Sequence, residues 1–113
     1  MPGWSKYAGR RIDHLKRWKQ YVKLLYEVAR GLSSEVYVIG GAAEDRLTVL
    51  SDIDLVIVVE EALPDSDRRR IKADILWAAV ERGLPLDYPV EIHILSREEF
   101  ETYLRHGTAI RVV

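Results

Sequence analysis

The sequence contains no cysteine and no asparagine, and glutamine occurs once, at Gln20. Without cysteine, the chain can form no disulfide, no zinc–thiolate centre and no thiol nucleophile. Its 17 basic and 18 acidic side chains leave a net charge of −1, so no overall charge recruits nucleic acid or an anionic membrane. Few amide side chains beside frequent Glu, Lys and Arg are typical of proteins from thermophiles.

Long apolar runs are missing as well. No stretch approaches the length that spans a membrane, and residues 1–4 carry no apolar core of a secretory signal. We therefore expect a cytoplasmic protein without a membrane partner. With 113 residues, 48% of them hydrophobic and 31% charged, the chain is expected to fold as a single domain over residues 1–113.

Hydrophobic periodicity and turn residues predict elements in the order α-β-β-α-β-α. The helices are expected from Ile12 to Gly31, from Pro64 to Gly83, and from a capping box at Ser96–Glu99 through Leu104. The strands are expected over residues 36–39, 52–59 and 89–95. One helical turn over residues 42–46 is possible, and residues 108–113 are either a short strand or a tail.

The segment 52–59 is apolar almost throughout, which predicts a central strand covered on both faces. The glycines Gly40 and Gly41 end the strand before it, whereas Asp52 and Asp54 begin it. If these residues serve one site, the two strands run antiparallel. Glu91, near the start of the third strand, joins that site only if this strand runs parallel to the second. We expect an α/β (α+β) fold with a small mixed sheet covered by helices.

Asp52 and Asp54 are the strongest functional signal. Strand residues two apart point to the same face, so both carboxylates aim at one spot. Two like charges that close repel each other unless a cation lies between them, and Mg²⁺ prefers oxygen ligands. Glu91 would add a third carboxylate, and paired metals about 3.5–4 Å apart are a known solution for displacement at phosphorus.

Gly40 and Gly41 supply a second signal. Without a Cβ atom, the backbone can bend there and approach a ligand closely. Amides of the turn that follows could hold phosphate oxygens.

The segment from Ile39 to Val58 resembles the nucleotidyltransferase superfamily typified by DNA polymerase beta. It is most similar to the stand-alone minimal nucleotidyltransferases of archaea and bacteria. Their pattern is an apolar residue with Gly and then Gly or Ser, a gap of about ten residues, and Asp-x-Asp after a serine that enters a strand. Here the pattern is Ile39-Gly40-Gly41 and Ser51-Asp52-Ile53-Asp54.

This resemblance implies a nucleoside triphosphate substrate and Mg²⁺, with two ions expected. It implies nucleotide binding by Gly40, Gly41 and Ser51, and catalytic and metal-binding roles for Asp52, Asp54 and Glu91. The implied reaction moves a nucleoside monophosphate, AMP by preference, to a hydroxyl acceptor. Stand-alone members resemble the antitoxin half of two-component systems and act with a helical partner called HEPN, so a HEPN-like partner or self-association is expected.

Two alternatives stay open. The domain could be a catalytically weak nucleotide-binding or antitoxin-like subunit that scaffolds or neutralises a helical partner. Ala42 favours this reading, because the minimal proteins often carry Arg after the second glycine position. An Asp-x-Asp phosphohydrolase fits less well, because that chemistry also needs a downstream lysine and acidic pair, and Lys72 is the only lysine after the motif.

Other residues are interpreted as structural. His93 is interpreted as a partly exposed sheet residue, because no histidine or cysteine is available as a co-ligand. Trp18 and Trp77 are assigned to the core, and residues 68–70, three arginines, to a solvated helix face. Trp4 and Tyr7, beside the basic first helix, are the expected docking surface.

Overall fold

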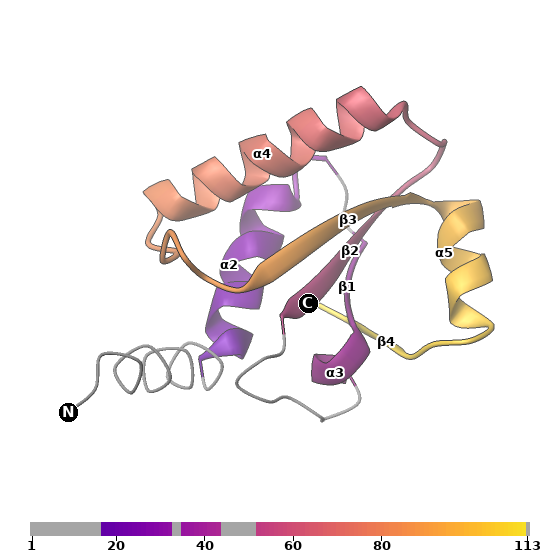
Figure 1. Ribbon diagram of the computed structural model, residues 1–113, viewed down its shortest axis with the longest axis horizontal. Coiled ribbons are helices and arrows are strands. Elements are labelled where there is room, and N and C mark those ends of the chain that lie inside the picture. The colour runs from indigo at the N-terminus through magenta and orange to yellow at the C-terminus, as the bar shows by residue number, and fades with distance from the viewer. Residues whose placement is uncertain (1–16, 33–34, 44–51, 113) are drawn as a thin grey trace, which may run out of the picture.

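The computed structural model describes residues 17–32, 35–43 and 52–112. Its elements are α2 (Trp18–Ala29), β1 (Val36–Ile39), α3 (Gly40–Ala43), β2 (Ile53–Val59), α4 (Asp65–Glu81), β3 (Val90–Ser96), α5 (Arg97–Leu104) and β4 (Ala109–Arg111) (Figure 1). Within these ranges, no helix is both long and apolar enough to cross a membrane.

The helix and strand predictions are largely confirmed, with differences at the ends. The turn expected over residues 42–46 begins earlier, at Gly40, where a φ of 68° turns the chain directly out of β1. Residues 108–113, expected to form either a short strand or a tail, contain a strand, β4. Ser51, Trp4, Tyr7 and the expected helix start at Ile12 lie outside the described residues.

The four strands form one mixed sheet in the order β3-β2-β1-β4. As predicted, β1 pairs with β2 antiparallel and β3 pairs with β2 parallel. Helix α4 provides the crossover that the parallel pair requires. Strand β4 pairs antiparallel with β1 and is the last strand of the sheet on that side.

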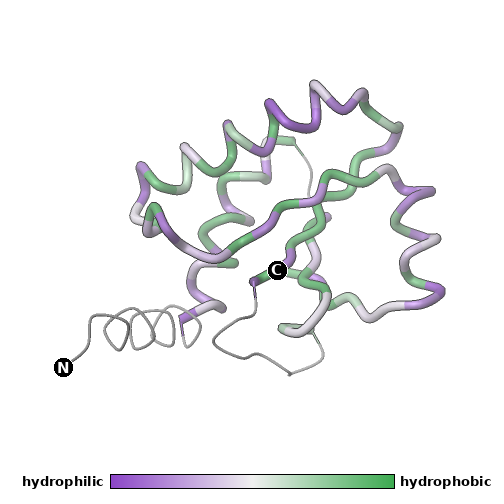
Figure 2. Tube along the Cα trace, viewed as in Figure 1, coloured by the Kyte–Doolittle hydropathy of each residue, from purple (hydrophilic) through white to green (hydrophobic). Residues whose placement is uncertain are grey.

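Strand β2 is buried on both faces, as its apolar sequence predicts. Figure 1 shows α2 and α4 on one side of the sheet and α5 on the other. Figure 2 shows hydrophobic stretches along the central strands. One face of β2 joins the core under α2 and α4 through Ile53, Leu55 and Ile57. The other face packs Val56 and Val58 against Phe100 of α5.

Trp77 corrects the core prediction. Trp77 is 61% exposed, whereas Ile75 and Ala79 of the same helix are buried. The reason is helical phase: Ile75 and Ala79 are one turn apart and face the sheet, and Trp77 lies about 200° around the helix axis from each of them. Trp18 packs against the core but is only partly buried.

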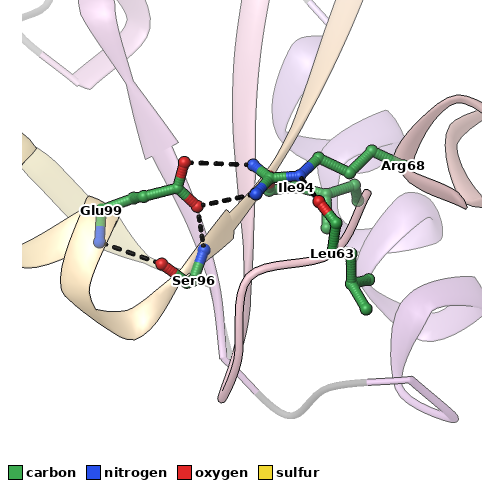
Figure 3. Close-up of polar contacts among 5 residues, drawn as sticks. All are labelled: Leu63, Arg68, Ile94, Ser96 and Glu99. Atoms are coloured by element: carbon green, nitrogen blue, oxygen red, sulfur yellow. Dashed lines mark hydrogen bonds and ion pairs between the residues drawn. The ribbon is translucent and has the colours of Figure 1, made fainter. Parts of the chain in front are cut away.

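Arg68 corrects the interpretation of the arginine run as a solvated face. Its side chain is 17% exposed and fastens the start of α4 to β3 and α5 (Figure 3). The guanidinium donates to the carbonyl oxygens of Leu63 at 2.7 Å and Ile94 at 2.9 Å, and pairs with both carboxylate oxygens of Glu99 at 3.1 and 3.2 Å. The backbone N–H of Ser96 and then Arg68 hold the pKa of the Glu99 carboxyl below its usual value.

Glu99 also completes the predicted capping box of α5. The Ser96 hydroxyl accepts from the Glu99 N–H at 3.1 Å, and the Glu99 carboxylate accepts from the Ser96 N–H at 2.9 Å. One carboxylate therefore serves both the helix cap and the arginine.

We expect Arg68→Met to lower the free energy of unfolding by about 2 kcal/mol, because it removes charge-assisted hydrogen bonds to two carbonyls and a carboxylate. Arg69→Met is the matched control, since Arg69 is the exposed neighbour on the same helix. Urea unfolding followed by circular dichroism measures both variants. Equal stability of the two variants would show that the Arg68 contacts are not stabilising.

Candidate active site

Three separate parts of the sequence meet in one row across the sheet. Asp54 is the register partner of Ile39 on β1 and of Glu91 on β3. Gly40 follows Ile39 directly, so the glycine pair adjoins the same row. Asp54 shares a sheet face with Val56 and Val58, which α5 covers through Phe100. Asp54 lies nearer the start of β2 and is partly exposed, with 29% of its side chain accessible.

Gly40 lies directly against the Asp54 carboxylate. A Cβ atom built on Gly40 would meet Asp54 Oδ2 at 3.0 Å, closer than ordinary van der Waals contact. The φ of 68° also lies in the left-handed region that favours glycine. The sequence predicted that the backbone at this glycine approaches a ligand closely, which stays a prediction; the group found nearest to a Cβ at Gly40 is the Asp54 carboxylate.

His93 is the functional candidate that sequence reasoning missed. Its Nε2 lies 3.2 Å from Asp54 Oδ1, and its side chain is 31% exposed. Strand alternation puts His93 on the same face as Glu91, whereas Ile92 and Ile94 are buried on the other face. The signal was the Glu-x-His spacing on a strand parallel to β2, with carboxylates rather than another histidine as neighbours.

Asp54, Glu91 and His93 can place one ligand atom each within 4.8 Å of one another. Two carboxylates and an imidazole at this spacing match the donors that divalent cations use. Glu91 is exposed and Asp54 and His93 are partly exposed, which leaves room for further ligands. The donor set therefore fits a divalent metal ion.

Asp52 has a different setting from Asp54. It lies one residue before β2 and is exposed. It is not among the three residues whose ligand atoms cluster within 4.8 Å in the described part of the chain. The structure thus brings Asp54 and Glu91 together, whereas Asp52 lies just before the first residue of β2. Its expected role as a metal ligand stays a prediction.

Comparison with known proteins identifies a family and finds similar solved structures, of which two are given. The nucleotidyltransferase domain family matches residues 15–110. A crystal structure from Sulfolobus solfataricus, provisionally assigned as a nucleotidyltransferase, has a TM-score of 0.58 and 23% identity, covering 89% of this chain and 84% of that one. At this identity the likeness shows the fold.

A second structure with the same provisional assignment has a TM-score of 0.45 and 25% identity, covering 88% of this chain and 98% of that chain, a similarity too weak to argue from. No curated protein matches this chain in sequence.

Proposed function

The chain belongs to the nucleotidyltransferase domain family, and on that premise we propose that it moves a nucleoside monophosphate, AMP by preference, from a nucleoside triphosphate to a hydroxyl acceptor. The observation that carries the proposal is the row formed by Asp54, Glu91 and the end of β1 before Gly40. These are the residues that the family resemblance marks as functional.

We assign separate tasks to these residues. Asp54 and Glu91 would hold divalent metal between β2 and β3, with Asp52 joining from the start of β2. Such a metal would offset phosphate charge and favour attack by a hydroxyl. Gly40 leaves space for the Asp54 carboxylate. Gly40, Gly41 and Ser51 remain candidates for binding the triphosphate. Two Mg²⁺ ions are the proposed complement, because three carboxylates would then be shared between them.

We place the acceptor on another protein surface, either a helical HEPN-like partner or a second copy of the chain. The described elements all belong to the sheet or pack on it, so none forms a separate acceptor-binding unit in these ranges. The partial exposure of Asp54 and His93 leaves the row open to such a surface.

The test compares two labels of ATP. Protein, divalent metal and lysate from the source organism are incubated with ATP labelled at the α- or the γ-phosphate. Nucleotidyl transfer puts only the α-label on an acceptor and releases pyrophosphate, whereas a kinase would transfer only the γ-label. ATP binding without either label would favour the alternative of a catalytically weak binding subunit. Absence of both binding and transfer would contradict the proposed function.

A further inference from the structure

We propose that His93 is a ligand of the metal site and shifts its preference from Mg²⁺ toward Mn²⁺ and Co²⁺. This inference rests on the proposed function, because it concerns the metal that Asp54 and Glu91 would hold. The family resemblance supplied carboxylates only, so an all-oxygen site and Mg²⁺ were expected. The nitrogen donor comes from the structure.

The first argument is distance. His93 Nε2 lies 3.2 Å from Asp54 Oδ1. One ligand atom from each of Asp54, Glu91 and His93 lies within 4.8 Å of the other two. Two ligands at right angles around a small divalent ion, each about 2.1 Å from it, lie about 3 Å apart. The imidazole and the aspartate are thus already spaced as neighbouring ligands of one ion.

The second argument is how the strands hold these groups. His93 and Glu91 are two residues apart on β3 and project to one face, while Ile92 and Ile94 fix the other face in the core. The parallel register puts Asp54 opposite Glu91. The backbone therefore delivers one nitrogen and two carboxylates to the same spot without any change in the sheet.

The third argument is donor chemistry. Mg²⁺ binds oxygen ligands and dehydrates reluctantly, whereas imidazole suits transition metals, whose affinities rise from Mn²⁺ through Co²⁺. A site with two carboxylates and one imidazole should therefore lose affinity for Mg²⁺ relative to an all-oxygen site. The competing explanation is that His93 only holds Asp54 in position through a hydrogen bond.

The two explanations differ in a measurable way. A positioning residue changes the affinity for every metal alike, because each metal uses Asp54. A nitrogen ligand changes the ratio of affinities. His93→Gln is the informative variant, since its amide can still donate to Asp54 but offers a metal an oxygen in place of the imidazole nitrogen. His93→Leu removes both abilities, and His106→Gln, at an exposed histidine after α5, is the matched control.

The experiment titrates the 113-residue protein with Mg²⁺, Mn²⁺ and Co²⁺ by calorimetry. Electron spin-echo measurements on bound Mn²⁺ detect a directly bound nitrogen. We expect the Co²⁺-to-Mg²⁺ affinity ratio to fall by about tenfold or more in His93→Gln, and the nitrogen signal of the wild type to disappear. His106→Gln should keep both. Circular dichroism verifies folding, and His93→Leu replaces His93→Gln if the latter is unfolded.

Two results would overturn the inference. An unchanged affinity ratio, together with no nitrogen signal in wild-type protein, would leave His93 as a positioning residue and leave the proposed function intact. Absence of divalent metal binding in the wild type, or binding that Asp54→Asn leaves unchanged, would overturn the inference and the proposed metal site together.

Discussion

Asp54→Asn is expected to abolish metal-dependent nucleotide binding and to lower the rate of nucleotidyl transfer by about 10³-fold. Asp54 is the member of the row that adjoins all the others. Asp54 is paired in register with Glu91, and its Oδ1 lies 3.2 Å from His93 Nε2. Gly40, which has no Cβ atom, leaves room for the Asp54 carboxylate. A metal at such a site supplies several kcal/mol of charge stabilisation, and each 1.4 kcal/mol corresponds to about tenfold in rate.

Asparagine is the suitable substitution because it keeps the shape of aspartate and removes only the charge. In the absence of metal, Asp54→Asn should be as stable as the wild type or slightly more stable, because it relieves repulsion between Asp54 and Glu91. In the presence of metal, the wild type should gain thermal stability and the variant should not, since ligand binding stabilises only the state that binds.

The measurements are thermal unfolding with and without Mg²⁺ or Mn²⁺, and transfer of the α-label of ATP. Glu101→Gln is the control, because it removes one exposed carboxylate that lies on α5, outside the candidate site. Unaltered metal-dependent stabilisation in a folded Asp54→Asn protein would contradict the role of Asp54. Loss of stability without metal would instead point to a structural role for its charge.

The sheet topology could be predicted because residues of one site must meet, and this requirement determines the direction of each strand. The glycines end one strand and the aspartates begin the next, so a shared site required antiparallel β1 and β2. Glu91 near the start of β3 then required a parallel pair and a crossover, which α4 provides. The apolar run of β2 fixed its central position, because few other arrangements bury both faces of a strand.

Side-chain partners from distant parts of the chain could not be predicted in this way. Arg68 and Glu99 are 31 residues apart in sequence, and only the packing of α4 against β3 and α5 brings them together. The arginine run looked solvated because charge patterning describes a helix face and not what covers it. Trp77 shows the opposite error, since a large aromatic in a loosely amphipathic helix was assigned to the core without a check of its helical phase.

His93 was missed for a related reason. Histidine and cysteine are the usual co-ligands of histidine in structural zinc sites, but the carboxylates of Asp54 and Glu91 can serve as co-ligands as well. The parallel pairing of β2 and β3 was predicted, and it implied that His93 and Glu91 share the face of Asp54. The contact between His93 and Asp54 depends also on the register of the two strands, in which Asp54 lies opposite Glu91.

Gly40→Ala is expected to weaken metal binding strongly while the protein stays folded. The added Cβ would lie 3.0 Å from Asp54 Oδ2 and force this carboxylate to move by a few tenths of an ångström. Residues that orient metal ligands commonly alter affinity by about 10–100-fold, and we expect a loss in that range. The φ of 68° adds a conformational cost of about 1–2 kcal/mol for any residue with a Cβ.

Gly83→Ala separates the two effects. Gly83 has a φ of 114°, and among the described residues no heavy atom beyond its two chain neighbours lies within 4 Å of a Cβ built there. This variant bears backbone strain at the end of α4 without touching the candidate site. Urea unfolding should therefore show a loss of stability in both variants, whereas calorimetric titration with Mn²⁺ should show weakened binding only in Gly40→Ala. If Gly83→Ala weakened Mn²⁺ binding as much, the effect would come from general destabilisation and not from the contact between Gly40 and Asp54.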